Sequence, residues 1–499
     1  MVSGVAVANE ASTAGVPAAP SRLRRIGRWC TRHPALTAFL VALGIRALLA
    51  VGIYLLHDGA IFGDETTYTG LAEMAAAGET GSWDPFIRGL YWGTATFTVP
   101  MTALFWLFGP KILVAQLLAG FYAAVAAGLT ARVAAFVAAP GLALAAGLVV
   151  ALMPSQVLFS TLVLKDSGVW ATLAALAVVI AAMSRSRGRS LLWGAAAAAV
   201  VLWLLGHLRE HTTVVAVWAM LSAAVIPADE RVRRVGALAV VAALVPALVG
   251  IGPFGVTLIL DHGSLVDRRA ENAEGAETAF VPSRANERLR EVEERRVEAE
   301  IGLGESEREL GDIEEELRRA RDAQAAALAA ELEARLQAAR AAAEQRRAEL
   351  RALREQEARA RARAAATPTA DLGESFGEGR GTSSQLRHLP LGLRVMVLDP
   401  LPWHATSNLR VQLAKAENLL WYPLLAAAAY AVIVRRRDLD VFAFPLLASG
   451  GIFVMYALSE GNFGTAFRHR GETVWAMAIM AVAGVEAILR RRSSATDAG

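Results

Sequence analysis

The 499-residue chain has one cysteine, Cys30, and only three lysines, Lys111, Lys165 and Lys415, against 47 arginines. A single cysteine excludes an internal disulfide and any cysteine-based metal site. The formal net charge of +3 is too small to indicate a nucleic-acid partner. The heavy use of alanine and arginine suggests a bacterial genome of high GC content, and it makes each remaining lysine a residue of interest.

Charge is also scarce outside one segment. Residues 284–366 hold 38 of the 97 charged residues, as 18 Arg and 20 Asp or Glu. The other 416 positions hold 59, about 14%, whereas soluble domains average roughly 25%. With 55% hydrophobic residues and a mean hydropathy of +0.39, the chain is neither an ordinary soluble protein nor disordered over most of its length. These features predict an all-α, polytopic membrane body that carries one charged, soluble segment.

A helix needs about 20 apolar residues to cross a bilayer. The first apolar run, 35–56, is long enough to span and is not followed by a small-residue cleavage site, so no cleavable signal peptide is expected. The run 94–109 is short, contains Pro100 and lies between Trp92 and Trp106, which favours an interfacial helix. Ten spans are predicted, at 35–56, 111–136, 141–155, 166–183, 191–206, 212–227, 235–260, 418–434, 440–457 and 472–489.

The arginines predict the orientation of these spans. Five arginines between 22 and 32 precede the first span, which favours a cytoplasmic N-terminus. With ten spans, every dense arginine cluster outside the charged segment is cytoplasmic except Arg-His-Arg at 468–470. We therefore expect a multi-pass protein of the bacterial plasma membrane with both termini in the cytoplasm. The expected regions are a basic tail 1–34, a membrane domain 35–260 with an external loop 57–110, an extracytoplasmic segment 261–416, membrane helices 417–490 and a tail 491–499.

The charged segment 284–366 has apolar residues at heptad-like spacing, with a phase change near 322–331. The early glycines predict a short helix at 285–300, a glycine turn and a long helix at 305–365, about 90 Å in length. Arms this unequal would not form a symmetric hairpin, and 367–389 is expected to be a linker. The mixed charges favour a solvated coiled-coil arm whose apolar stripe would gain from a second copy or from an envelope partner. The apolar series is Leu310, Ile313, Leu317, Ala320, Leu332, Leu336, Ala339, Ala343, Leu350 and Leu353.

The predicted topology gathers polar residues at the outer mouths of the spans. Charged groups at a helix mouth usually face a cavity within the protein. Acidic and basic groups on one face suit a reaction that needs a general base and an anion-binding group. The residues are Asp64, Glu65, Lys165, Asp166, Arg209, Glu210, Asn462, Arg468, His469 and Arg470.

One motif in this set points to a different chemistry. His207-Leu-Arg-Glu210-His211 matches the inverted zinc-protease pattern His-x-x-Glu-His. On one helix, His207 and His211 would share a face. The motif lies, however, in a short connection between two predicted spans, and the sequence offers no evident third ligand. No metal site is therefore predicted there.

Five stretches together resemble a known family. They are IFGDETTY at 61–68, MPSQVLFSTLVLKD at 153–166, LDPLPW at 398–403, KAENLLWYPLL at 415–425, and EGNFGTAFRHR at 460–470 before the last span. Their order and shared side resemble bacterial family-39-like members of the C-type glycosyltransferase superfamily (GT-C). The resemblance covers nearly all of the chain except the charged segment. None of these stretches contains an Asp-x-Asp, so a pair of metal-binding carboxylates is not carried over.

The resemblance implies transfer of a sugar from a polyprenyl-phosphate carrier to an acceptor outside the cytoplasm. Asp64 would act as general base, with Glu65 and Asp166 as further candidate catalytic acids. The candidate ligands of the donor phosphate are Lys165, Arg209, Arg468, His469 and Arg470. No cofactor is assigned, although a divalent cation is compatible with the site. Membrane lipids are the other expected partner, and nucleic acid is not.

Other interpretations remain open at this stage. Asp166 could be an acid favoured by the dipole of its helix, and Lys165 could extend its ammonium group to the interface. The chain could also be a glycan polymerase or ligase that uses a lipid-diphosphate carrier, or a non-catalytic membrane scaffold. A transporter is a further alternative, although transporters favour ionisable groups at the midplane and internal repeats, and neither is evident.

Overall fold

A computed structural model describes residues 22–56, 63–226, 231–249, 284–366, 382–403, 409–436, 439–459 and 463–496. Within these ranges the chain is helical and contains no strand, which confirms the predicted all-α class. Asn462, the tail 1–21 and residues 250–283 lie outside the described residues. The helices before the charged segment are α1 (Arg22–Arg32), α2 (Pro34–Leu56), α3 (Gly63–Ala76), η1 (Glu79–Ser82), α4 (Pro85–Gly93), α5 (Ala95–Phe108), α6 (Ile112–Ala134), α7 (Pro140–Leu152), α8 (Pro154–Ser160), α9 (Asp166–Met183), α10 (Arg189–Gly206), α11 (Glu210–Val225) and α12 (Arg231–Val249). Those that follow are α15 (Arg284–Asp322), α16 (Ala326–Ala366), α18 (Thr382–Leu398), α19 (Leu409–Val434), α20 (Leu439–Ser459), α21 (Phe463–Arg470), η3 (Gly471–Thr473) and α22 (Val474–Thr496).

Seven described helices are long and apolar enough to cross a membrane, and an eighth crossing results if the bent pair α7–α8 counts as one span. The seven segments overlap predicted spans. Six lie in α2, α6, α9, α10, α19 and α20, and the seventh, Ala466–Ser494, runs from α21 through η3 into α22. Of the other three predictions, 141–155 is the bent pair, 212–227 is the 16-residue α11, and 235–260 is described only to Val249. The run 94–109 forms the short helix α5, which leaves Trp106 exposed.

Small residues allow the central helices to pack closely. The buried face of α6 consists mostly of alanine and glycine, and it packs against α2, α7 and α9. Gly147 of α7 marks one close approach, because a Cβ at this position would lie 2.5 Å from the Ala38 Cβ and 2.8 Å from the Ala127 carbonyl oxygen. Small residues at such contacts are typical of helix packing in membranes.

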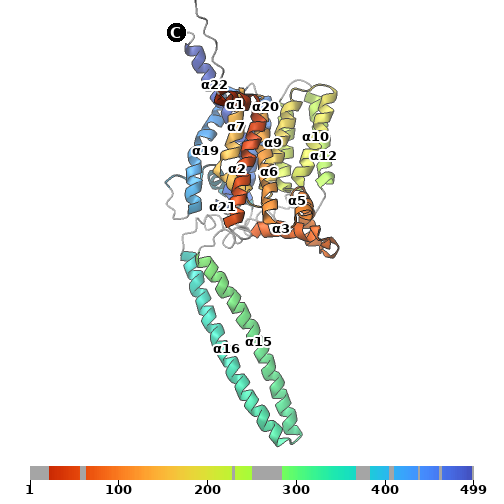
Figure 1. Cartoon of the computed structure of the whole chain (residues 1–499), viewed down its shortest axis with the longest axis vertical. Coiled ribbons are helices and arrows are strands. Elements are labelled where there is room, and N and C mark those ends of the chain that lie inside the picture. The colour runs from red at the N-terminus through yellow and green to blue at the C-terminus, as the bar shows by residue number, and fades with distance from the viewer. Residues whose placement is uncertain are drawn as a thin grey trace, which may run out of the picture.

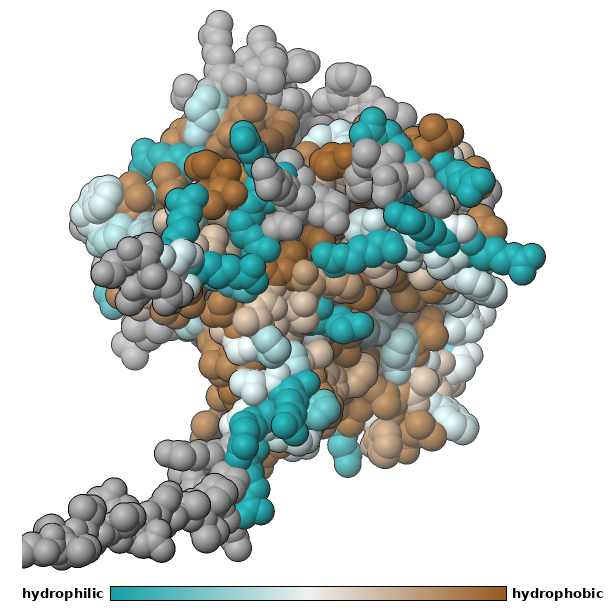
Figure 2. Space-filling model, turned by 90° about the horizontal axis from the view of Figure 1, so that it is seen from above, coloured by the Kyte–Doolittle hydropathy of each residue, from teal (hydrophilic) through white to brown (hydrophobic). Residues whose placement is uncertain are grey.

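The bundle has two distinct ends (Figure 1). At the α1 end, the link 136–139 between α6 and α7 is held by Arg185, Arg435 and Glu486. Figure 2 looks onto this end and shows hydrophilic side chains spread among apolar ones. At the opposite end, named the α3 end here, lie α3, α5 and α21.

The charged segment forms an antiparallel hairpin of two nearly equal helices, α15 with 39 residues and α16 with 41 (Figure 1). The prediction of unequal arms with a glycine turn was therefore wrong. Helix α15 continues through Gly302, Gly304 and Gly311, each of which costs only about 1 kcal/mol in a helix. The turn instead lies at the phase change, where Gln324 adopts a left-handed φ of 55°.

The predicted apolar stripe closes the hairpin on itself. Ile313, Leu317 and Ala320 of α15 form one buried cluster with Leu332 and Leu336 of α16. The two helices of the hairpin thus bury their apolar residues against each other, whereas a partner from another chain was expected. A further correction concerns the expected linker 367–389, because α18 already begins at Thr382.

Candidate functional site

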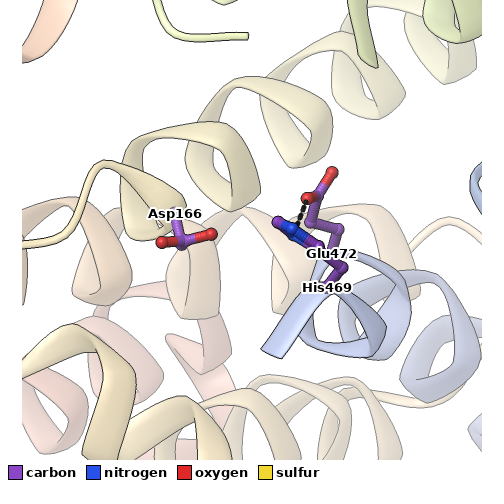
Figure 3. A group of neighbouring side chains, drawn as sticks. All are labelled: Asp166, His469 and Glu472. Atoms are coloured by element: carbon purple, nitrogen blue, oxygen red, sulfur yellow. Dashed lines mark hydrogen bonds and ion pairs between the residues drawn. The ribbon is translucent and has the colours of Figure 1, made fainter. Parts of the chain in front are cut away.

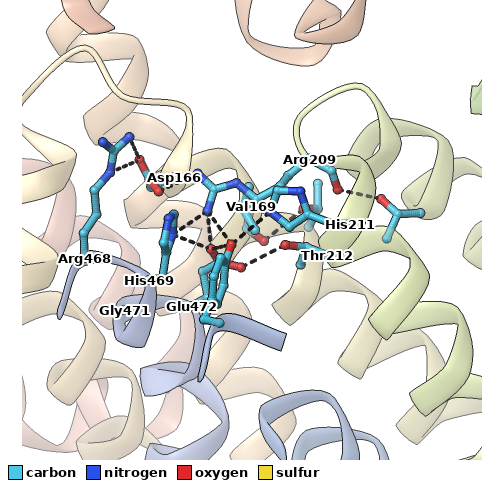
Figure 4. A network of polar contacts seen from close by, with 12 residues as sticks. Asp166, Val169, Arg209, His211, Thr212, Arg468, His469, Gly471 and Glu472 are labelled. Carbon is cyan, nitrogen blue, oxygen red and sulfur yellow. Dashed lines mark hydrogen bonds and ion pairs between the residues drawn. The ribbon is translucent and has the colours of Figure 1, made fainter. Parts of the chain in front are cut away.

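A network of charged and polar side chains lies at the α3 end of the bundle (Figure 4). Its residues come from segments far apart in the sequence: the beginnings of α3, α9 and α11, the C-terminal part of α20, and the α21–η3 segment. These are largely the mouths at which the sequence predicted the chemistry. The structure therefore brings most of the predicted site residues together.

Asp166, the first residue of α9, lies at the centre of this network and is fully buried. One carboxylate oxygen accepts a hydrogen bond from Arg209 Nη2 at 2.9 Å. The other accepts two from Arg468, from Nε at 2.9 Å and from Nη2 at 2.6 Å. The carboxylate also lies at a helix N-terminus, where the backbone dipole favours negative charge. Asp166 thus fixes two arginines from different parts of the chain.

Arg209 is buried and has four partners. Besides Asp166, its guanidinium donates from Nη1 to Tyr456 Oη at 2.9 Å, lies 2.8 Å from His469 Nδ1 and pairs with Glu472. With its donors turned inward, Arg209 acts as an internal clamp between α9, α11 and η3. Its burial does not suit the role of phosphate ligand proposed from the sequence.

Glu472 is a buried acid that binds several neighbours of the network. It accepts from Tyr456 Oη at 2.7 Å and from Thr212 Oγ1 at 3.1 Å, in addition to its pair with Arg209. The His469 ring lies 3.1 Å away through Nδ1 and stacks on the Tyr456 ring with a centroid separation of 4.0 Å. This set makes the inner part of the network rigid, because each polar group is held by more than one neighbour.

Asp64 and Lys165 form the outer part of the site. Asp64, in the first turn of α3, is 51% exposed and accepts from Arg468 Nη1 at 2.9 Å. Arg468 is 12% exposed, so it connects the accessible carboxylate to the buried one. Lys165 is half-buried, with Nζ 5.8 Å from the centre of the Tyr68 ring. Burial and the nearby Arg209 guanidinium lower the pKa of Lys165 to about 8.

Two predicted site residues turn out to support the fold. Glu65 is fully buried, and its carboxylate accepts a hydrogen bond from the Val163 amide at 2.9 Å, which ties α3 to the link before α9. Arg470 is also buried, and its guanidinium contacts α19, where Nη2 lies 3.7 Å from Glu417 Oε1. It donates to Asn418 Oδ1 at 2.9 Å and lies 5.0 Å from the Trp421 ring centre. Neither side chain is placed to touch a substrate at Asp64.

The described residues include one group of His, Cys, Asp or Glu side chains close enough together to hold a metal ion (Figure 3). It consists of Asp166, His469 and Glu472. One ligand atom from each lies within 4.8 Å of the others. Arg209 contacts all three residues, so its guanidinium already supplies positive charge to this group. A metal ion would therefore have to displace Arg209.

The His-x-x-Glu-His motif is not arranged as a metal site. His207 follows the end of α10, where its Nδ1 lies 2.9 Å from the Trp203 carbonyl oxygen. His211 is in α11, with Nε2 3.2 Å from Tyr456 Oη. The chain changes direction between them, so the two rings do not share one helical face.

Sequence reasoning missed Glu472, Tyr456 and Thr212. All three lie inside predicted spans, within otherwise apolar runs. Glu472 did carry a signal, because an ionisable residue in a membrane helix is costly and usually has a partner within the protein. Tyr456 and Thr212 carried no comparable signal.

The chain matches no family model, no curated protein and no solved structure.

Proposed function

We propose that the protein is an integral membrane glycosyltransferase. It transfers a sugar from a polyprenyl-phosphate carrier to an acceptor on the extracytoplasmic side. The observation that carries this proposal is the pairing of an accessible carboxylate, Asp64, with Arg468, which buried Asp166 fixes in place. Half-buried Lys165 adds a second cation next to them.

The chemistry assigns a role to each outer residue. Asp64 accepts the proton of the acceptor hydroxyl while the hydroxyl oxygen attacks the anomeric carbon of the sugar. The bond between that carbon and the carrier phosphate oxygen breaks, and the phosphate leaves with additional negative charge. Arg468 and Lys165 stabilise that charge, Arg468 through forked hydrogen bonds. A site at one end of a membrane bundle also leaves the lipid tail of the donor in the bilayer.

The arginines support the side assigned to this reaction. The arginines of α1, of the α9–α10 connection and of the C-terminal part of α22 lie at the end opposite Asp64. Because arginine-rich loops favour the cytoplasm, the α3 end is assigned to the outside. Labelling of single cysteines at 64 and 187 from outside intact cells, after Cys30→Ser, tests this: 64 should react and 187 should not.

Asp64→Asn tests the reaction itself. Purified protein is supplied with a panel of polyprenyl-phosphate sugars, and transfer is measured by release of polyprenyl phosphate. Loss of a general base should lower the rate by about 10²–10⁴-fold. Glu73→Gln is the matched control, because Glu73 is an exposed acid on the same helix. A folded Asp64→Asn protein with wild-type activity would refute the base assignment.

A further inference from the structure

The bent pair α7–α8 precedes the site along the chain, because residues 161–165 join α8 to Asp166 at the beginning of α9. The two helices meet at 54°, with Met153 in an extended conformation between them. Pro154 has no amide hydrogen, so the Val150 carbonyl loses its helical partner. The Ala151 carbonyl loses its own partner, because the Ser155 amide binds the Glu417 carboxylate at 2.6 Å instead. In a membrane-spanning helix, such unpaired backbone groups must find other partners.

Arg46 of α2 supplies them. Its guanidinium donates to the Ala151 carbonyl at 2.9 Å and to the Val150 carbonyl at 3.2 Å. Three further contacts run to Ala42 O, Gln156 O and Ser160 Oγ. An arginine has five N–H donors, and all five are used here. Gly120 provides the space, since a Cβ there would lie 3.1 Å from the Arg46 Cβ.

Glu417 of α19 completes the other side of the break. Its carboxylate accepts from both the amide and the hydroxyl of Ser155, at 2.6 Å and 2.9 Å. The Arg46 guanidinium therefore lies at the C-terminal carbonyls of α7, and the Glu417 carboxylate lies at the N-terminal amides of α8. Both positions are those that the helix dipoles favour for a positive and a negative charge. In transporters, the ends of broken helices bind substrate or ions. Here side chains of the chain itself occupy them.

Helix α8 is connected to two segments that carry site residues, the α21–η3 segment and the link before α9. Gln156 Nε2 donates to the Gly471 carbonyl at 3.1 Å, two residues beyond His469. Beyond α8, the link that contains Val163, bound to Glu65, leads to Lys165 and Asp166. Any movement of α8 would thus displace both Gly471, which follows Arg468 and His469, and the link that leads to Lys165 and Asp166.

The geometry points to Arg46 and Glu417 as positioning residues: they lock the α7–α8 break so that α8 holds the 161–166 link in the arrangement the site requires. The expected effect on donor binding rests on the proposed function. The fixing of the α7–α8 break by Arg46 and Glu417 does not. It makes the break a fixed support of the site and not a ligand site of its own.

The test measures hydrogen–deuterium exchange on the full-length protein, in a peptide covering 157–168. Ser160→Ala removes one partner of Arg46. Glu417→Gln weakens the bond to Ser155 and also removes the negative charge that faces Arg470. Both should raise exchange in this peptide several-fold, while hairpin peptides from α15 and α16 stay unchanged. Arg46→Met should raise it further and Arg46→Lys should give an intermediate value. If Arg46→Met does not fold, the two milder variants decide.

Ser449→Ala is the matched control, because it removes a buried serine hydroxyl from α20 that has no hydrogen-bond partner among the described residues. It should leave the 157–168 peptide at the wild-type rate. Wild-type exchange in folded Ser160→Ala and Glu417→Gln would overturn the inference, and so would a rise spread evenly over the bundle. The dissociation constant for polyprenyl phosphate should rise in the same variants. If exchange rises but polyprenyl phosphate does not bind even the wild type, the proposed function fails and the positioning role stands.

Discussion

The two charged regions of the protein use the same residue types in opposite ways. In the site network, the carboxylates of Asp166 and Glu472 are fully buried, and each binds several partners. In the hairpin, pairs such as Arg321–Glu333 and Arg340–Glu314 are more than half exposed on both sides. Burial, and not the number of ion pairs, therefore decides what a charge contributes. An exposed pair is worth about 0.2–1 kcal/mol, whereas removing one partner of a buried pair costs about 3–5 kcal/mol.

The source of cohesion differs as well. The hairpin is held by its apolar stripe, and the surface ion pairs between α15 and α16 mainly favour the antiparallel pairing. The site end of the bundle depends on charges that tie together helices distant in sequence. Substitutions that neutralise charge should therefore disturb the bundle strongly and the hairpin weakly.

The largest effect is expected for Asp166→Asn. The change keeps the shape of the side chain but leaves Arg209 and Arg468 without their shared anion. We expect a loss of about 3–5 kcal/mol in the free energy of unfolding of the bundle. Thermal unfolding in detergent, followed by near-ultraviolet circular dichroism, measures it.

Asp64→Asn is the matched control for this change, because it removes an exposed partner of the same Arg468. The free energy of unfolding of this variant should fall only by about as much as the loss of an exposed ion pair costs, even though its transfer activity is lost. Equal destabilisation by the two variants would remove the distinction between the inner and outer parts of the site.

The sequence predicted which segments lie together better than it predicted the contacts between their side chains. Asp64, Asp166, Arg209, Arg468 and His469 were expected on one side because the spans alternate in direction, and the structure brings them together. The direction in which each side chain points depends on tertiary packing. That is why Arg209, predicted as a phosphate ligand, is enclosed by the network.

Lone charges within apolar runs were the signal that sequence reasoning passed over. Arg46 lies within the first predicted span, and Glu472 begins the last one. Each proves to be buried with several partners. The hairpin differs from its prediction for another reason: the helix-forming neighbours of the three glycines keep α15 continuous, and the turn falls at the change in heptad phase.

The second prediction concerns the hairpin core. Leu336→Ala removes a buried side chain from the interface between α15 and α16 and should destabilise their pairing by about 2–5 kcal/mol. Hydrogen exchange of the full-length protein should show faster exchange in both hairpin helices and no change in α6 or α9. Leu328→Ala is the control, because Leu328 is half exposed on the same helix. Faster exchange in the bundle would mean that the two regions unfold together.

The third prediction is a pH dependence from Lys165, whose pKa is lowered to about 8. Its positive charge is lost as pH rises through 8, so the KM for the donor should rise by up to about tenfold per pH unit above that value. The unfolded chain binds more protons than the folded one between pH 8 and 10.5, so folding stability rises with pH over this window. The rise in KM is therefore not caused by unfolding.

Lys165→Arg sharpens the pH test, because arginine keeps its charge over the whole range. The KM step near pH 8 should disappear in this variant and persist in Lys111→Arg, which changes an exposed lysine. If the step is the same in both variants, another group titrates and Lys165 does not bind the donor phosphate.

The smallest effect is expected for Arg340→Gln in the hairpin. Arg340 Nη2 lies 2.7 Å from Glu314 Oε1, but both side chains are more than half exposed, so water and salt already compete for their charges. We expect a loss of at most about 1 kcal/mol in hairpin stability, and less at high salt. The double variant with Glu314→Gln should be no less stable than either single variant. A loss as large as that of Asp166→Asn would show that exposed pairs carry the hairpin, and the contrast between the two regions would not hold.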